Sequence, residues 1–212
     1  MSLLTPMLRS SPLTDWFSDA QRVQGMLDFE AALAQAQAAC GMVPPEAVGP
    51  IVAACRHEAI DFAALGEAAV GAGNLAIPLV KQLTAKVKAQ DPEAARYVHW
   101  GATSQDAIDT GLVLQLRGAL DAAETLLEQL LAALALQADR YRDTVMPGRT
   151  WMQHALPVTF GLKLAGTLDA LLRWQQRLRE MRPRLLALQF GGAAGTLDAL
   201  KEKGPAVGLA LA

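Results

Sequence analysis

Two short polar segments contain most of the residues that could do chemistry, and the first runs from His99 to Asp106. It places Thr103 and Ser104 directly before a long apolar-periodic stretch. Hydroxyls and free backbone N–H groups at the start of a helix bind a carboxylate well, because the helix dipole is positive there. The same hydroxyls are also common helix caps. The segment therefore predicts either a carboxylate site or a helix cap.

The second polar segment runs from Gly148 to Pro157 and precedes another long apolar-periodic stretch. It brings Thr150, Gln153 and His154 close together in the sequence. So many polar side chains between two apolar stretches predict a pocket for a polar ligand. The alternative is an exposed turn with a histidine that is already hydrogen-bonded. The sequence contains no phosphate-binding loop, dinucleotide-binding glycine pattern or metal-ligand cluster.

Two long amphipathic helices must position these segments. Apolar residues that alternate at spacings of three and four predict one helix over 105–143 and a second that begins at Phe160. Pro183 is expected to kink or end the second helix. Such long apolar faces need partner helices, so the pattern predicts an oligomeric helical bundle. The apolar face of the first helix consists of Val113, Leu116, Leu120, Ala123, Leu127, Leu130 and Leu134.

The residues before these helices predict a small helical domain. Ser18 begins a capping pattern, so a helix is expected from Asp19 to Cys40. Shorter helices are expected over 46–56 and 78–90, with loops over 71–74 and 98–104. The predicted fold class is all-α. The predicted domains are an N-terminal helical domain, residues 1–104, and the first part of a central long-helix bundle, residues 105–212.

The composition excludes several classes of protein. The 212 residues are 52% hydrophobic, which is too apolar for a disordered chain. A net charge of −2 disfavours nucleic-acid binding. No apolar run approaches the roughly 18 residues of a membrane span. Cys40 and Cys55 form neither a disulfide framework nor a metal-ligand spacing, so they indicate a reducing compartment, and a cytoplasmic location is expected.

Both polar segments resemble blocks of one family. Residues 101–110, Gly-Ala-Thr-Ser-Gln-Asp-Ala-Ile-Asp-Thr, resemble the Thr-Ser-x-Asp block of the fumarase/aspartase/adenylosuccinate lyase superfamily. Residues 148–161, Gly-Arg-Thr-x-x-x-His-Ala-x-Pro-x-Thr-Phe-Gly, resemble its second block. The order, the spacing and the position before each long helix match throughout the 212 residues. The resemblance implies a homo-oligomer, a tetramer with shared active sites.

Two departures indicate the branch of the superfamily. Trp151 stands where adenylosuccinate lyases have a histidine implied in general acid chemistry, and Asn74 lies in a loop where they have a second histidine. Together with residues 190–196, these features resemble the bacterial 3-carboxy-cis,cis-muconate cycloisomerases. The resemblance implies conversion of this small polycarboxylate to 4-carboxymuconolactone in protocatechuate breakdown, through the β-ketoadipate pathway. It implies no metal and no organic cofactor.

The same resemblance implies roles for individual residues. The predicted catalytic residues are His99, Ser104 and His154, and Ser104 also belongs to the predicted substrate-binding set. The other predicted substrate-binding residues are Asn74, Thr103, Thr150, Trp151 and Gln153. Arg149 is expected to hold its loop rather than to touch the substrate. A third family block, which implies a serine acting as acid or base, is absent from the sequence, so no turnover is expected from these 212 residues alone.

Three alternatives stay open. A 3-sulfomuconate cycloisomerase would share the same features. A lyase acting on adenylosuccinate or argininosuccinate belongs to the same superfamily, although Trp151 and Asn74 argue against it. A non-enzymatic helical scaffold would use the polar segments only as helix caps.

Overall fold

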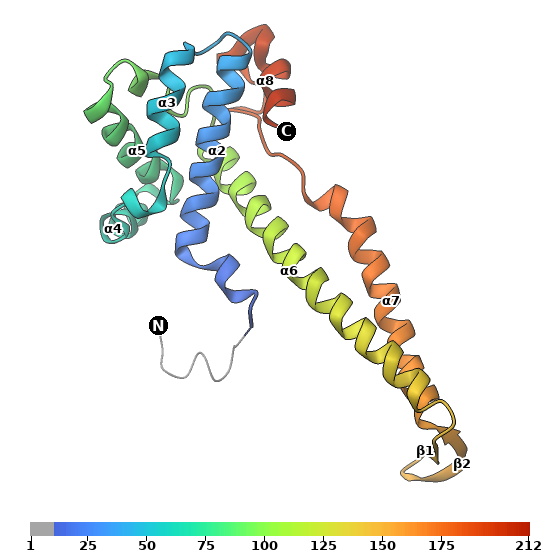
Figure 1. The fold of residues 1–212 in the computed structure, drawn as a ribbon. Coiled ribbons are helices and arrows are strands. Elements are labelled where there is room, and N and C mark those ends of the chain that lie inside the picture. The colour runs from blue at the N-terminus through green and yellow to red at the C-terminus, as the bar shows by residue number, and fades with distance from the viewer. Residues whose placement is uncertain (1–10) are drawn as a thin grey trace. The chain divides into compact units, whose positions relative to one another are not determined.

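The computed structural model describes residues 11–212, and nearly all of its elements are helices (Figure 1). They divide into two compact units. The first unit holds the described residues up to Gly118 and those of Leu186–Ala212, and the second holds Ala119–Leu185. The boundary falls inside helix α6 (Ser104–Arg140), which contributes to both units. The sequence predicted domains over 1–104 and 105–212. These bounds refer to the complete bundle, so they stay a prediction.

Helix α2 (Asp19–Ala39) is the centre of the first unit. The side-chain Oγ of Ser18 accepts a hydrogen bond from the backbone N–H of Gln21 at 3.3 Å, which confirms the expected helix cap. The helix packs against α3 (Pro45–Ala54) and against α8 (Gly204–Leu211). It therefore has neighbours on more than one side, and ten of its residues are buried.

The core of this unit is aliphatic, with Phe29 as its largest buried side chain. Leu27 and Leu33 of α2 join Leu79 and Leu83 in one cluster of fully buried residues. The remaining elements of this unit are η1 (Thr14–Phe17), η2 (His57–Ala59), α4 (Phe62–Ala72), α5 (Ala76–Gln90), η3 (Ala94–Tyr97) and η4 (Asp198–Lys203).

Helix α4 was not expected from the sequence. The side chain of Asp61 caps it by accepting from the backbone N–H of Ala64 at 3.0 Å, and Gly73 ends it in the left-handed conformation with φ 74°. The expected loop over 71–74 is therefore wrong in its first two residues, because Gly71 lies in the last turn of α4. Gly71 and Gly73 both suggested a break, but of these two glycines only Gly73 has the positive φ of a helix end.

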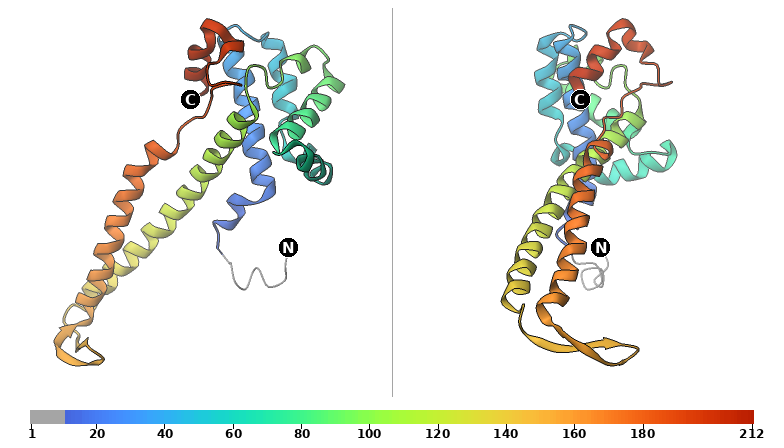
Figure 2. Two further views of the ribbon diagram at one scale, coloured as in Figure 1. Left: turned by 180° about the vertical axis from the view of Figure 1, so that it is seen from behind. Right: turned by 90° about the vertical axis from the view of Figure 1, so that its right-hand side faces the viewer.

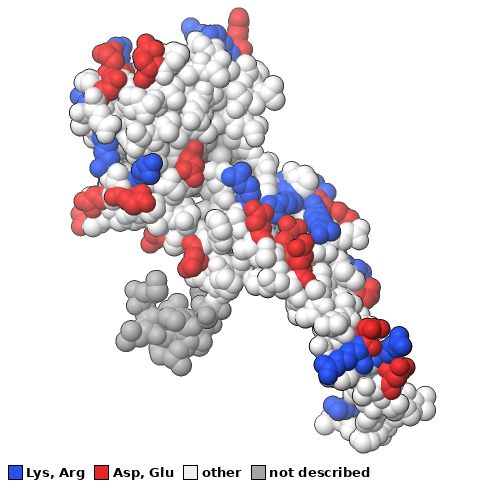
Figure 3. All heavy atoms as spheres, viewed as in Figure 1, with Lys and Arg blue, Asp and Glu red and all other residues white. Residues whose placement is uncertain are grey.

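The second unit contains the rest of α6 and helix α7 (Phe160–Leu185), which run side by side in both views of Figure 2. Arg182 of α7 pairs with Asp121 and Glu124 of α6. Arg179 pairs with Glu128 at 3.4 Å. Figure 3 shows these basic and acidic side chains next to one another along the helix pair. These arginines therefore bridge the two helices.

Both long helices confirm the periodicity of the sequence. The first, expected over 105–143, is α6, and the second ends two residues after Pro183, as expected. None of the helices between residues 11 and 212 combines the length and the apolarity that crossing a membrane requires.

The segment between α6 and α7 is a β-hairpin, which the sequence analysis did not expect. Strand β1 (Val145–Thr150) pairs antiparallel with β2 (Gln153–Thr159), and the register is irregular between Pro147 and Arg149. Two prolines and a glycine in these strands weakened the strand signal, since proline cannot donate a ladder hydrogen bond. The predicted break is therefore an ordered hairpin.

Candidate active site

Residues 98–103 connect η3 to α6 and carry the first group of predicted site residues. His99 has φ 59°, in the left-handed region that non-glycine residues rarely adopt. Gly101 follows with φ 74°, and a Cβ there would lie only 2.6 Å from a methyl carbon of Leu200. The turn therefore needs glycine at 101 and holds a histidine in a strained conformation at 99.

Two buried side chains of α2 hold this connection. The Oε1 of Glu30 lies 2.6 Å from Nδ1 of His99. The Nε2 of Gln37 donates to the carbonyl oxygen of Trp100, also at 2.6 Å. Glu30 and Gln37 are seven residues apart on the helix and so lie on one face, two turns from each other. They fix two consecutive residues of the connection.

Asp106 holds the end of the same connection. Its carboxylate accepts hydrogen bonds from the backbone N–H groups of Thr103, Gly191 and Gly192 at 2.9–3.0 Å. A carboxylate that satisfies three backbone donors fixes each of them strongly. Asp106 therefore joins the start of α6 to the glycine-rich segment 191–195. The sequence analysis assigned no role to Glu30, Gln37 or Asp106.

The hydroxyls of Thr103 and Ser104 are free to bind a ligand. Helix α6 begins at Ser104, and both residues are half-buried. Within residues 11–212, neither hydroxyl forms a hydrogen bond with the protein, and the carboxylate of Asp106 occupies the backbone N–H of Thr103. The capping alternative is therefore not seen, and two hydroxyls stand at the positive end of a long helix.

The environment of His99 favours its protonated form. Burial acts to lower the pKa of this histidine, but the hydrogen bond to Glu30 and the negative charges of Glu30 and Asp106 act against it. The net effect raises the pKa of His99 above the ordinary histidine value of 6.5. This setting therefore favours the protonated form of the ring more than solvent does.

Asn74, the fourth predicted residue of the first unit, caps a different helix. Its Oδ1 accepts from the backbone N–H of Ile77 at 3.0 Å, at the start of α5. In the part of the chain that the structure describes, no hydrogen bond links Asn74 to residues 98–104. His99, Thr103 and Ser104 thus lie together at the start of α6, whereas Asn74 caps the start of α5.

The hairpin of the second unit carries the other predicted residues. Thr150 pairs with Gln153 across the strands, and Arg149 pairs with His154. Trp151 and Met152 form the two-residue turn, with φ of 50° and 60°. Such turns usually contain Asn-Gly, because both residues need a positive φ. The Trp151 side chain is 92% exposed, so this end of the hairpin presents apolar surface that its own unit does not cover.

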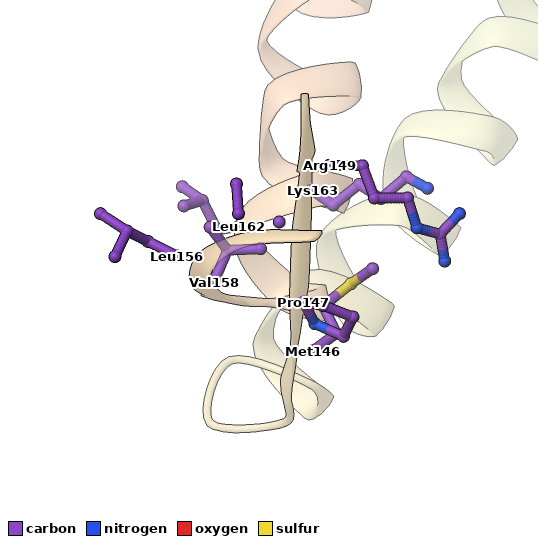
Figure 4. A pocket seen from close by; sticks show the side chains of 9 residues that line it. Met146, Pro147, Arg149, Leu156, Val158, Leu162 and Lys163 are labelled. Atoms are coloured by element: carbon purple, nitrogen blue, oxygen red, sulfur yellow. The ribbon is translucent and has the colours of Figure 1, made fainter. Parts of the chain in front are cut away.

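A hollow of about 600 Å³ lies beside the hairpin, lined mainly by apolar side chains (Figure 4). Leu156 and Val158 lie on one side of it, whereas Arg149 and Lys163 extend to the other. The predicted residues of the turn do not line this hollow. The side chain of Arg149 forms no hydrogen bond or ion pair with another residue of the described chain, so a loop-holding contact of this side chain is not seen.

Cys40 and Cys55 are both free cysteines. Burial, together with the charges of Glu30 and Asp28, raises the pKa of the Cys55 thiol to about 12. Cys55 therefore stays a protonated, buried thiol, whereas Cys40 is only partly buried. The described residues contain no group of three or more His, Cys, Asp or Glu side chains that could hold a metal ion.

Comparison with known proteins identifies the family. A family model described as "Lyase" matches residues 8–209. The chain belongs to this lyase family. The match confirms the superfamily that the two sequence blocks indicated. A 3-carboxy-cis,cis-muconate cycloisomerase of Pseudomonas aeruginosa is 62% identical over 203 residues, which cover 96% of this chain and 44% of that relative.

Solved structures of the lyase family have the same fold. The crystal structure of 3-carboxy-cis,cis-muconate lactonizing enzyme from Pseudomonas putida matches with a TM-score of 0.96 and 56% identity, over 99% of this chain and 48% of that one. A fumarate lyase from Mesorhizobium sp. BNC1 matches with a TM-score of 0.88 and 42% identity, over 94% and 46%. These matches confirm the helical fold class. The chain spans about half the length of the relatives it matches.

Proposed function

We propose that this chain is part of a 3-carboxy-cis,cis-muconate cycloisomerase. The observation that carries the proposal is the 62% identity to an enzyme of that name. The sequence supports it independently, because Trp151 replaces the histidine expected of an adenylosuccinate lyase. An indole cannot accept or release a proton in catalysis, so the hairpin suits a reaction other than the ordinary elimination.

The proposed reaction is an intramolecular conjugate addition. A carboxylate oxygen of the substrate forms a bond to an alkene carbon, and the electron pair of that double bond moves toward the neighbouring carboxyl-bearing carbon. This enolate-like carbon then takes up one proton, which gives 4-carboxymuconolactone. No group leaves. The main demand on the protein is to stabilise the negative charge that develops next to a carboxylate, and preorganised donors meet that demand best.

The start of α6 is the proposed carboxylate site. Thr103 and Ser104 offer two hydroxyls that have no hydrogen-bond partner among residues 11–212, and the helix dipole favours an anion there. His99 adds positive charge and a ring nitrogen that can donate a hydrogen bond. A polycarboxylate would gain from all three groups, since hydrogen bonds to charged partners are the stronger ones. Asn74 is proposed to reach the same substrate through its side-chain amide.

The hairpin residues are proposed to complete the site from another subunit. Thr150 and Gln153 would bind the substrate, His154 would take part in catalysis, and Trp151 would shape the pocket. This requires a homo-oligomer, and we propose a cytoplasmic tetramer with shared active sites. The exposed Trp151 supports the proposal, because a side chain of that size is usually covered in the working protein.

The proton donor is proposed to lie outside these residues. The superfamily resemblance implies a serine in a third block as acid or base, and the sequence of this chain has no such block. The 212 residues therefore supply binding groups and are proposed to be inactive alone. The complete protein would add the serine.

The test is a substrate panel with a protein that joins this chain to the remaining length of its relatives. Loss of the diene absorbance of 3-carboxy-cis,cis-muconate, with 4-carboxymuconolactone identified by mass and NMR, is the expected result. Preference for 3-sulfomuconate would assign the neighbouring activity. Release of fumarate from adenylosuccinate or argininosuccinate would assign a lyase, and inactivity on the whole panel would contradict the proposal.

Substitution of Ser104 and Gln153 by alanine separates the enzyme from a scaffold. In an enzyme, the complete protein with S104A and Q153A keeps its fold and loses turnover. In a scaffold these residues only cap or fill turns, and their loss costs at most about 1–2 kcal/mol of unfolding free energy. Thermal unfolding and turnover, measured on the same samples, distinguish the two.

A further inference from the structure

Glu30 is a buried carboxylate that the proposed reaction does not yet use. Its side chain is 1% exposed, and Oε1 contacts Nδ1 of His99 at 2.6 Å. Its other oxygen, Oε2, is buried without a hydrogen-bond partner in the described chain. A half-satisfied carboxylate in an apolar core costs stability. A hydrophobic residue at this inward position of α2 would pack better, so stability alone does not account for Glu30.

His99, the partner of Glu30, is held in an unfavourable backbone conformation. His99 has φ 59°, and left-handed strain of this kind costs about 1 kcal/mol or more. The neighbouring bond from Gln37 to the Trp100 carbonyl fixes the backbone on the same side of α2. Glu30 therefore holds the ring of His99, and Gln37 holds the backbone of the next residue. Such strain concentrates at functional sites.

The geometry leaves one nitrogen of His99 available. Nδ1 faces Glu30, and no hydrogen bond to Nε2 is found among residues 11–212. The His99 side chain is 17% exposed, so part of it is accessible to solvent. The charged groups that face the ring are Glu30 from α2 and Asp106 from α6. Both are acidic, so both favour a proton on the ring.

We propose that Glu30 is a positioning residue that holds Nδ1 of His99 and thereby directs a protonated Nε2 toward an anionic substrate group at the start of α6. The identity of the substrate in this inference rests on the proposed function. The pairing of Glu30 with His99 does not. Glu30 never touches the substrate; it acts through the histidine. No bond forms or breaks in this role, and the carboxylate stays ionised throughout.

The first arm of the test measures the histidine directly. Deuterium exchange at the ring C2–H, read by mass spectrometry of peptides, gives the midpoint of titration for each histidine in a protein of any size. His57, His99 and His154 fall far apart in the sequence and are resolved as separate peptides. The expected result is a His99 midpoint above the ordinary range in the wild-type protein, moved to lower pH in Glu30→Gln. An unchanged midpoint in this variant would overturn the proposal.

Two controls make the first arm specific. Asp28→Asn removes another carboxylate of α2. This carboxylate accepts a hydrogen bond from Gln24 and does not contact His99, so the titration midpoint of His99 should not change. His57 contacts Gln24 of α2 at 3.1 Å, and its own midpoint reports whether α2 remains folded in each variant. If Glu30→Gln also changes the titration midpoint of His57, the His99 midpoint is measured in Glu30→Asp instead. Glu30→Asp keeps the charge but withdraws it from Nδ1, so it should lower the His99 midpoint less.

The second arm measures turnover in the complete protein. Glu30→Gln is expected to lower kcat/KM for 3-carboxy-cis,cis-muconate roughly 10- to 100-fold, and to move the alkaline limb of its pH profile to lower pH. Asp28→Asn should leave both unchanged. Turnover that Glu30→Gln does not alter would overturn the positioning role. A shifted His99 midpoint in a protein that never converts muconate would support the pair and reject the proposed function.

Discussion

Asp106 shows how a single side chain can organise the proposed site. It is 6% exposed and accepts three backbone hydrogen bonds, from one residue before α6 and from two glycines near the other end of the sequence. Gly192 has φ 70°, and a Cβ there would lie 2.9 Å from the carbonyl oxygen of Gly101. The carboxylate therefore sits where two tightly packed segments meet.

Removal of this carboxylate should be costly. Asp106→Ala leaves three backbone N–H groups without their acceptor, so we expect a loss of about 2–4 kcal/mol of unfolding free energy. Urea denaturation of the two proteins measures the difference. Asp109→Ala is the matched control, because among the described residues Asp109 accepts only from the side chain of Gln105, and its removal should cost about 0.5 kcal/mol. Equal losses in the two variants would contradict this role of Asp106.

The stability contributed by His99 should depend on pH in a definite direction. Folding raises the pKa of His99, so the folded chain binds this proton more tightly than the unfolded chain does. The stabilisation is complete below the unfolded value of 6.5 and is lost as the pH rises through the higher folded value. Glu30→Gln removes the hydrogen bond and the charge of Glu30, which raise the pKa of His99, and retains the charge of Asp106, which raises it, and the burial, which lowers it.

We therefore expect the wild-type advantage in unfolding free energy over Glu30→Gln to shrink as the pH rises from about 6 to about 9. Urea titrations at several pH values across this range measure it. A gap that stays constant, or that widens with pH, would contradict the assigned pairing.

At the residue scale the sequence predicted caps better than buried polar pairs. Ser18 was predicted as a cap because the signal is local, three residues before the group it satisfies. Glu30 and Gln37 fall at inward positions of the apolar pattern of α2, and this was a usable signal. Their partners His99 and Trp100 lie more than sixty residues away, so the pairing itself could not be read from local spacing.

At the scale of the elements, helices α2 and α6 contact each other at two glycines, Gly25 and Gly111. A Cβ on Gly111 would lie 2.9 Å from the backbone nitrogen of Met26, and one on Gly25 would lie 2.6 Å from the carbonyl oxygen of Gly111. Backbone atoms cannot move aside as a flexible side chain can. The small residues therefore set the separation of the helix that carries Glu30 from the helix that begins at Ser104.

Substitution at this crossing should separate the two helices. We expect Gly111→Ala to lower the unfolding free energy by about 1–3 kcal/mol, because α2 must shift to admit the methyl group. Gly66→Ala in α4 is the control, since nothing lies within 4 Å of its Cβ position. That variant should gain about 0.5–1 kcal/mol from the higher helix propensity of alanine. A gain in both variants would show that the crossing is looser than the structure indicates.

The hairpin marks the limit of element prediction from this sequence. The helices were found because their apolar faces repeat over many turns, whereas β1 and β2 are short, contain prolines and are exposed along most of their length. Nothing in the local pattern required Trp151 and Met152 to adopt positive φ. The position of Trp151 in the second block was recognised, but its place at a turn was not.

On the scale of the whole molecule, the second unit buries little of its apolar surface. Leu130, Leu136, Leu162 and Trp174 are all exposed on α6 and α7 within that unit. Long apolar helices in this condition need further helices to cover them. The sequence predicted this need from the length of the apolar faces. The number and the source of the covering helices depend on chain outside these 212 residues and on the proposed oligomer.

The most direct test of the account is the diene absorbance of 3-carboxy-cis,cis-muconate, followed side by side with this 212-residue chain and with a protein extended to the length of its relatives. We expect protein-dependent decay to 4-carboxymuconolactone with the extended protein, and none with the chain alone. Decay with the chain alone would contradict the requirement for the serine block. An extended, folded protein that leaves the absorbance unchanged would contradict the proposed function.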